Sequence, residues 1–284
     1  MNDIYLGIAI ILGGAAVLIA AGIQFNTRLS KAAAIAAVLV TMLALAAYVA
    51  FLRESALLAR LLPFSNLIVV GNWLPLFGGL LAGIVFNRIP GGRVRRWLYV
   101  TMLMLACSYT LLAPLIGKAP LGGDYWTRDR IAIQTSDSSC SAACAATLLN
   151  TVGIRTTESE MIELCLTRNN GTMWYGLYRG LKLKTAGTAY DVELLKAKVS
   201  DLKSGALKGP LILSVRLDLK PGIDERYQKK WGWLPGVAHS VVFFKMIDDG
   251  KAAEMGDPSV GRERWGFEAI ETLWHGDAMR LVKR

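Results

Sequence analysis

The chain has 284 residues and a mean hydropathy of +0.38, which is higher than ordinary soluble proteins show. Its formal net charge is +10, but the segment before residue 118 supplies +6 of this, with eight basic residues against two acidic ones. Because these basic residues flank long apolar runs, they are better explained as topology signals and contacts with anionic lipid than as phosphate-binding groups. The sequence has no P-loop and no zinc-finger spacing, so we expect no nucleic-acid partner.

The N-terminal part of the chain is dominated by apolar segments. Each has about twenty residues, which is the length that an α-helix needs to cross a lipid bilayer. They cover residues 5–25, 32–51, 66–86 and 98–117, and none of them contains a charged residue. We therefore predict a four-span transmembrane α-helical region at residues 1–117 that binds the lipid bilayer. Its glycines are expected at helix-packing positions, namely Gly13, Gly14, Gly78, Gly79 and Gly83.

The basic residues of the loops predict how the spans are oriented. The first loop carries Arg28 and Lys31, and the third carries four arginines between residues 88 and 96, against two arginines in the second loop. The positive-inside rule then places the first and third loops in the cytoplasm and both termini outside. We expect a multi-pass protein of the bacterial inner membrane whose C-terminal domain is periplasmic or extracellular.

Charged residues recur every few positions from Lys118 onward, so a second part of the chain begins there. Residues 118–130 contain proline and glycines and predict a linker. Beyond it, the patterns predict helices at residues 141–152, 159–166 and 266–276, another helix within 169–183, and strands at 131–133, 210–217, 239–247 and 252–258. Helices come first and most strands follow, so residues 131–284 are predicted to form an α+β domain.

Cys140 is the first candidate for a catalytic residue. The other cysteines are Cys107, which lies in a predicted span, Cys144 and Cys165, and their spacing fits neither a disulfide framework nor a zinc site. Cys140 follows a polar run at residues 135–139 and stands where a helix should begin. The unpaired amides and dipole of a helix N-terminus lower the pKa of a thiol, so Cys140 is the candidate nucleophile.

A cysteine hydrolase also needs a base, a group that orients the base, and donors for the oxyanion. Of the two histidines, His239 opens an apolar strand, whereas His275 is expected in the last helix or a turn. Asp257 follows the next strand, from where it could reach His239, and Gln134 could donate its side-chain amide together with the backbone N–H of Cys140. Each residue has a structural alternative on its own, but their ordered combination favours a hydrolase.

Four segments resemble the bacteriocin-processing, double-glycine-cleaving cysteine peptidases, which are papain-like. They are residues 134–154, 171–182, 239–265 and 267–276, so the resemblance spans roughly 131–276. It implies a papain-like cysteine peptidase domain, with helices packed on an antiparallel sheet, that cleaves a peptide or protein substrate after Gly-Gly. By position it implies Cys140 as nucleophile, His239 as base, Asp257 as orienting carboxylate and Gln134 as oxyanion donor, with no metal and no cofactor.

Two features bear on substrate binding. Ser141 stands where the family usually has glycine, so we expect its side chain to narrow the approach of a Gly-Gly substrate. Trp231 and Trp233, just before His239, either line the substrate cleft or cap an edge of the core. The chain also departs from the family's best-known members, which carry the peptidase at the N-terminus of an ABC exporter, because here it follows the spans and no ATPase motif is present.

Two other functions use the same features. A peptidase-like domain could bind a peptide or a partner without cleaving it, as an accessory subunit of a larger membrane complex. Acyl transfer to an amine would use the same thiol and base as hydrolysis. The chain has a residue for each of the four catalytic roles, and this favours a membrane-anchored cysteine peptidase.

Overall fold

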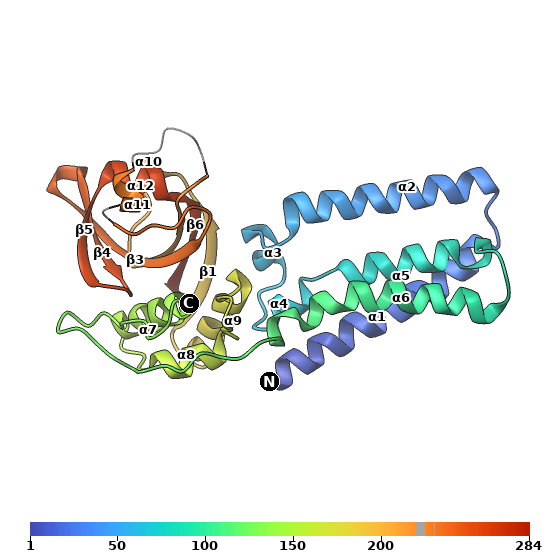
Figure 1. The fold of residues 1–284 in the computed structure, drawn as a ribbon, viewed down its shortest axis with the longest axis horizontal. Coiled ribbons are helices and arrows are strands. Elements are labelled where there is room, and N and C mark those ends of the chain that lie inside the picture. The colour runs from blue at the N-terminus through green and yellow to red at the C-terminus, as the bar shows by residue number, and fades with distance from the viewer. Residues whose placement is uncertain (220–224, 230) are drawn as a thin grey trace. The chain divides into compact units, whose positions relative to one another are not determined.

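A computed structural model of the chain describes residues 1–219, 225–229 and 231–284. The chain divides into two compact units, Met1–Ile116 and Gly117–Arg284 (Figure 1). The first unit is built of helices, and the second combines helices with one sheet.

The first unit contains the apolar helices. Its elements are α1 (Asn2–Asn26), α2 (Lys31–Ala47), which continues as a π-turn over Tyr48–Leu52, α3 (Ala56–Leu61), α4 (Leu67–Val70), α5 (Leu74–Val85) and α6 (Arg93–Leu112). Short 3-10 turns follow α5 at Phe86–Arg88 and α6 at Ala113–Leu115. Four stretches are long and apolar enough to cross a membrane, namely Asn2–Asn26, Lys31–Leu52, Leu67–Arg88 and Arg93–Leu115. They overlap the four segments predicted from the sequence.

Glycines bring α1 and α5 into close contact. A Cβ atom added to Gly83 would lie 2.5 Å from the carbonyl oxygen of Ile19 and 2.9 Å from the Cα of Gly22. One added to Gly79 would lie 2.7 Å from the carbonyl oxygen of Ala15. Gly79 and Gly83 are four residues apart and therefore face the same helix, as small residues do where apolar helices pack backbone to backbone. Both glycines are helix-packing positions, as the sequence predicts, whereas the prediction was wrong for Gly13, because no atom lies within 4 Å of a Cβ added there.

Replacing Gly83 with leucine should separate these two helices. The side chain has no space, and overpacking of this kind costs about 1–3 kcal/mol. Gly13→Leu is the matched control, because nothing lies within 4 Å of a Cβ added there. Thermal unfolding of the detergent-solubilised chain, followed by circular dichroism, should show a lower melting temperature for Gly83→Leu only. Equal melting temperatures would contradict this packing.

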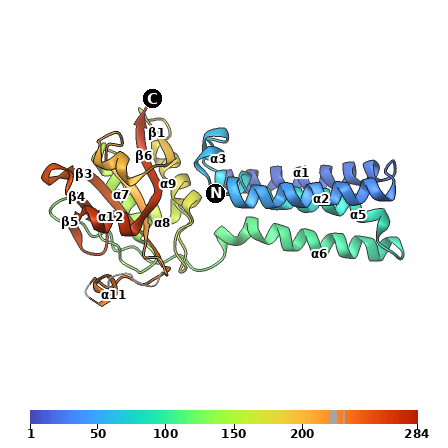
Figure 2. The same cartoon turned by 90° about the horizontal axis from the view of Figure 1, so that it is seen from above.

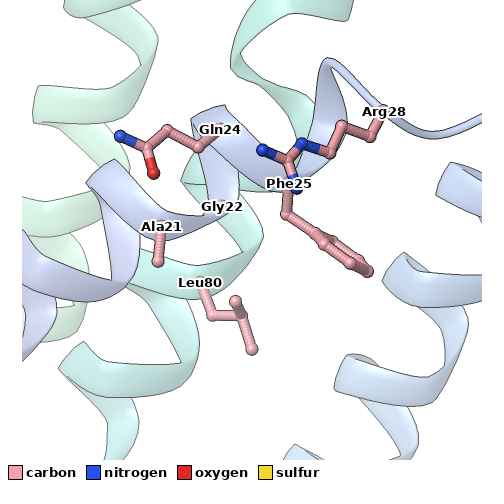
Figure 3. Close-up of a pocket in the computed structure, with 6 residues that line it drawn as sticks. All are labelled: Ala21, Gly22, Gln24, Phe25, Arg28 and Leu80. Atoms are coloured by element: carbon pink, nitrogen blue, oxygen red, sulfur yellow. The ribbon is translucent and has the colours of Figure 1, made fainter.

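A cavity of about 390 Å³ opens beside the end of α1 (Figure 3). Its lining residues come from α1, from the loop that follows it and from α5, and they are Ala21, Gly22, Gln24, Phe25, Arg28 and Leu80. All of them belong to the first unit. The cavity is therefore not formed by any of the candidate catalytic residues.

The second unit is an α+β domain, as predicted. Its helices are α7 (Cys140–Thr151), α8 (Glu158–Leu164), α9 (Trp174–Thr185), α10 (Val199–Lys203), α11 (Arg226–Lys229) and α12 (Phe267–Leu273). Its strands are β1 (Tyr190–Lys196), β2 (Leu211–Arg216), β3 (Ala238–Ile247), β4 (Ala252–Asp257), β5 (Gly261–Gly266) and β6 (Trp274–Lys283). The strands form one antiparallel sheet in the order β1-β6-β2-β3-β4-β5. In Figure 1, α7, α8 and α9 lie on one side of the sheet and α10 and α12 on the other, and Figure 2 shows β1 beside β6, which ends at the C-terminus.

The structure corrects several sequence-based boundaries. The strand expected at 131–133 is only an isolated bridge between Trp126 and Ala132. The last helix ends at Leu273 instead of residue 276, because the Trp274 side chain is buried and its indole N–H donates to the carbonyl oxygen of Asp277 at 2.9 Å. The sequence patterns predicted neither β1 nor β5 nor β6, and His275 lies in β6 instead of a helix or turn.

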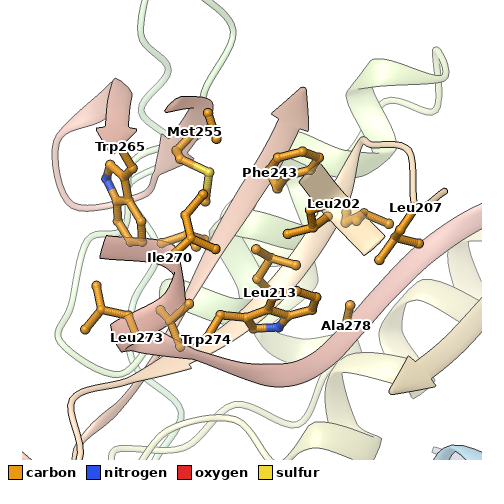
Figure 4. Close-up of a cluster of buried hydrophobic side chains, with 14 of the residues drawn as sticks. Leu202, Leu207, Leu213, Phe243, Met255, Trp265, Ile270, Leu273, Trp274 and Ala278 are labelled. Carbon is orange, nitrogen blue, oxygen red and sulfur yellow. The ribbon is translucent and has the colours of Figure 1, made fainter. Parts of the chain in front are cut away.

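A hydrophobic core holds β3 and β4 in place (Figure 4). Alternate residues of the strands point into it, such as Leu213 of β2, Phe243 of β3 and Met255 of β4, and α12 covers them with Ile270 and Leu273. Side chains at positions i and i+2 of a strand share a face, so this alternation fixes the register of each strand. The packing of β3 and β4 in this core thus fixes the positions of the first residues of β3 and the last residue of β4.

Candidate active site

Helix α7 places Cys140 at a buried helix N-terminus. Every residue from Cys140 to Leu149 is buried, and five of these ten are alanine or serine, whose small side chains let the helix lie close to the sheet. Cys140 is the first residue of the helix and its side chain is only slightly exposed. The sequence predicted this position from the polar run that precedes it.

Cys140, His239 and Asp257 form a connected group. His239 lies at the start of β3 and Asp257 at the end of β4, and the distance between His239 Nε2 and Asp257 Oδ1 is 3.0 Å. The imidazole and the Cys140 side chain also interact closely enough that each shifts the pKa of the other. Because Nε2 faces the carboxylate, Nδ1 is the ring nitrogen that is left for the thiol. All three side chains are largely shielded from solvent.

The electrostatics of this group favour a thiolate and an imidazolium. Burial raises the pKa of the Cys140 thiol, but the hydrogen bond and charge of His239, helped by the N–H of Ser240, outweigh burial and bring the pKa below its ordinary value. Burial lowers the pKa of His239, but the hydrogen bonds and charges of Asp257 and Cys140 together outweigh burial, so the pKa is raised above its ordinary value. These opposite shifts are those that activate a cysteine nucleophile.

Ser240 fastens α7 to β3 next to this group. Its hydroxyl lies 2.9 Å from the hydroxyl of Ser141, and its carbonyl oxygen accepts from the Cys144 thiol at 3.1 Å. Ser141 is buried and its hydroxyl contacts β3, and the same side chain helps to lower the pKa of Cys140. The hydroxyl of Ser141 thus connects α7 to β3. A contact between Ser141 and substrate stays a prediction.

Gln134 lies on the loop before α7, next to the turn that follows β4. Its backbone N–H donates to the carbonyl oxygen of Pro258 at 2.8 Å. Its side chain accepts from the Ser259 hydroxyl at 3.2 Å and donates to the carbonyl oxygen of Ser136 at 3.0 Å. The structure therefore links the predicted oxyanion donor to the segment that begins with Asp257.

The two tryptophans differ in position. The ring of Trp233 contacts the imidazole of His239 edge-on, with centroids 5.7 Å apart, and it also contacts the ring of Trp265. Trp231 instead contacts Tyr227 and Arg226 of α11. Trp233 thus borders the candidate site and packs at the edge of the core at the same time, whereas the contacts of Trp231 are with α11.

The remaining titratable candidates lie outside this group. His275 contacts the carbonyl oxygen of Arg216 at 3.1 Å and the carboxylate of Asp218 at 3.3 Å. Cys144 and Cys165 are buried free thiols, and burial raises the pKa of Cys165 to about 12. In the part of the chain that the structure describes, no cluster of three His, Cys, Asp or Glu side chains could hold a metal ion.

Glu158 is a structural residue of the site that sequence patterns did not reveal. Its side chain is fully buried at the start of α8 and accepts hydrogen bonds from the backbone N–H of Thr135 at 2.7 Å and of Gly123 at 3.1 Å. A Cβ added to Gly122 would lie 2.8 Å from the backbone of Ser159. The predicted linker therefore packs tightly against α8, together with the loop that carries Gln134. Only the capping-box-like spacing around Thr157 marked this region in the sequence.

Replacing Glu158 with alanine should destabilise the second unit. The backbone N–H groups of Thr135 and Gly123 would lose their charged acceptor, which costs about 2 kcal/mol in total and lowers the melting temperature by roughly 5 °C. Glu163→Ala is the control, because Glu163 is on the same helix but exposed. Thermal unfolding of the full chain, followed by tryptophan fluorescence, measures both. A Glu158→Ala variant as stable as Glu163→Ala would contradict the role assigned to this carboxylate.

Comparisons with known proteins give similarity only at the level of structure. No protein-family model matches the sequence, and no curated protein matches it. The peptidase domain of Streptococcus ComA, a bi-functional ABC transporter involved in a quorum sensing pathway, resembles the chain with a TM-score of 0.42 at 21% identity, covering 54% of this chain and 97% of that one. A double glycine motif protease from an AMS/PCAT transporter, solved in complex with the leader peptide, has a TM-score of 0.42 at 15% identity, covering 59% and 95%. Because these values are low, we base the proposed function on the contacts of Cys140, His239 and Asp257.

Proposed function

We propose that the chain is a membrane-anchored cysteine peptidase. The observation that carries the proposal is the connected group of Cys140, His239 and Asp257, with a thiol at a helix N-terminus and an imidazole 3.0 Å from a buried carboxylate. A structural cysteine needs no such partner, and Cys144, one turn further along α7, has none of these contacts with a base. The four apolar helices of the first unit support the membrane anchor.

The proposed reaction begins with the Cys140 thiolate attacking the carbonyl carbon of a peptide bond. A C–S bond forms and the carbonyl oxygen becomes an oxyanion, which the amide of Gln134 and the backbone N–H of Cys140 stabilise. The imidazolium of His239 then gives its proton to the amine nitrogen as the C–N bond breaks, which leaves a thioester. Water attacks the thioester, His239 takes the proton, and the acid and the free thiolate are released.

The substrate and the compartment belong to the same proposal. The motifs around Cys140 and His239 favour a peptide or protein substrate cut after Gly-Gly, and the loop arginines favour a domain that is periplasmic or extracellular with both termini outside. Reaction with an amine in place of water would give acyl transfer with the same residues, and the products of the reaction distinguish the two.

A peptidyl acyloxymethyl ketone tests the proposal on the full chain in detergent. This electrophile reacts with an activated thiolate in a cleft that accepts a peptide. We expect fast labelling, which mass spectrometry of the digested protein should locate at Cys140. Labelling no faster than that of a free thiol, or spread over several cysteines, would contradict a peptidase and favour a domain that binds peptides without cleaving them.

A further inference from the structure

We propose that Ser259 is a positioning residue that holds both the base-orienting carboxylate Asp257 and the oxyanion donor Gln134. This inference rests on the proposed function. Ser259 lies in the turn between β4 and β5, and it contacts Asp257 through its main chain and Gln134 through its side chain. A single residue thereby connects the acid–base side of the site with the oxyanion side.

The first contact orients the carboxylate. The backbone N–H of Ser259 donates to Asp257 Oδ1 at 2.8 Å, and this is the same oxygen that faces His239 Nε2 at 3.0 Å. An Asp side chain that accepts from the backbone N–H two residues ahead forms an Asx-turn, which restricts its rotation. The carboxylate that orients the imidazole is thus itself held by the turn.

The second contact orients the amide. The Ser259 hydroxyl donates to Gln134 Oε1 at 3.2 Å, while Gln134 Nε2 donates to the carbonyl oxygen of Ser136 at 3.0 Å. The reverse orientation of the amide would place two oxygen atoms against each other at Ser136, so these partners select one orientation. The amide nitrogen carries two hydrogens, and the bond to Ser136 leaves the second one to donate to an oxyanion.

The backbone adds a constraint to the same turn. The N–H of Gln134 donates to the carbonyl oxygen of Pro258, the neighbour of Ser259, at 2.8 Å. This bond and the N–H of Ser259 persist when the Ser259 side chain is shortened to alanine. The Ser259→Ala variant therefore removes the restraint on the Gln134 amide and keeps the Asx-turn at Asp257. It also removes a hydroxyl that helps to lower the pKa of Asp257, which is the reason for measuring a reaction of the thiolate that does not involve Gln134.

Two reagents separate these roles in the full chain. A peptide 4-nitrophenyl ester acylates Cys140 through a tetrahedral oxyanion, whereas iodoacetamide alkylates the thiolate without forming one. Their rates should be measured for the native chain, Ser259→Ala, Ser259→Thr, Gln134→Ala and the double variant Gln134→Ala/Ser259→Ala. Val260→Ala is the control for the turn, because Val260 is the exposed neighbour of Ser259.

We expect Ser259→Ala to lower the acylation rate by about fivefold and to leave the alkylation rate unchanged, because it loses one hydrogen bond to a neutral group. Ser259→Thr keeps the hydroxyl and should retain the native rate, as should Val260→Ala. Gln134→Ala should lower acylation by about a hundredfold, and the double variant should be no slower than Gln134→Ala, since Ser259 acts through Gln134.

Four outcomes would overturn the inference. Native acylation by Ser259→Ala, or a double variant slower than Gln134→Ala by the full fivefold, would show that Ser259 does not act through Gln134, although the peptidase would stand. An equal loss of alkylation would show that the serine acts on the thiolate. A native chain that neither reagent modifies faster than a free thiol would overturn the proposed function and this inference together.

Discussion

The Cys140→Ala variant should have no measurable peptidase activity, with kcat/KM at least about 10⁴-fold below that of the native chain. The reason is that the proposed reaction passes through a covalent thioester, and alanine offers no atom that can form it. The buried neighbours of Cys140 lose only one sulfur atom at the edge of the helix, so the fold should persist. Hydrolysis of a Gly-Gly-containing fluorogenic peptide by the detergent-solubilised chain measures the effect.

Cys144→Ser is the matched control for this prediction. Cys144 is on the same helix and is more deeply buried than Cys140, and a serine hydroxyl can keep the donation to the carbonyl oxygen of Ser240. Its activity should remain within a few-fold of the native value. Residual hydrolysis by Cys140→Ala, or loss of activity in Cys144→Ser in a folded chain, would contradict Cys140 as the nucleophile.

A peptide ester should acylate Cys140 of the His239→Ala variant about 10³-fold more slowly than Cys140 of the native chain at neutral pH, and the rate should depend on pH in a different way. In the native chain, His239 holds the pKa of Cys140 below its ordinary value, and Cys140 and Asp257 hold the pKa of His239 above its ordinary value. The rate should rise with pH as Cys140 ionises, stay level while the ion pair exists, and fall at high pH as the imidazolium loses its proton.

Without His239 both limbs of this pH profile should change. Burial then raises the pKa of Cys140 with no nearby cation to offset it, so the rising limb should move to higher pH and the falling limb should disappear. His275→Ala, which removes the other histidine, should keep the native profile because His275 contacts Arg216 and Asp218 instead. Rates of acylation by a peptide ester across the pH range measure this. An unchanged rising limb in His239→Ala would contradict the ion pair.

Local sequence patterns were sufficient to predict the elements that carry the candidate site. Helix α7 follows a polar run and consists of small residues, and β3 and β4 are apolar runs between turns. The contact between His239 and Asp257 was expected because each begins or ends such a strand and the two strands follow each other in the chain. The order and polarity of these segments were therefore enough to predict that His239 and Asp257 lie close together.

Other elements depend on contacts between distant segments. Strand β5 contains Arg262, Glu263 and Arg264 in a row, so Trp265 is its one large apolar residue and no apolar alternation marks it. It forms by pairing with β4, where Arg262 forms an ion pair with Glu254. Strand β6 begins within residues 266–276, whose sequence pattern predicts a helix. The helix ends earlier because the Trp274 side chain packs in the core with the strands and α12. Tertiary packing overrides local propensity at such positions.

The same limit applies to the residues that support the site. Ser240, Glu158 and Ser259 act through hydrogen bonds that join segments far apart in the sequence, and a serine or a glutamate has no distinguishing pattern of its own. The contact between Ser141 and Ser240 is another case, because helix geometry turns the Ser141 hydroxyl toward a strand that lies about a hundred residues further along the chain.

The ionisation of Cys140 itself tests the central claim most directly. The ultraviolet absorbance of the thiolate, taken as the difference between the native chain and Cys140→Ser in detergent, should be followed as a function of pH. We predict that the thiolate is present at neutral pH, with a midpoint below about 8.5, the value for a free cysteine, and that His239→Ala moves the midpoint above it. A native midpoint at or above that value, unaffected by His239→Ala, would contradict an activated nucleophile at this site.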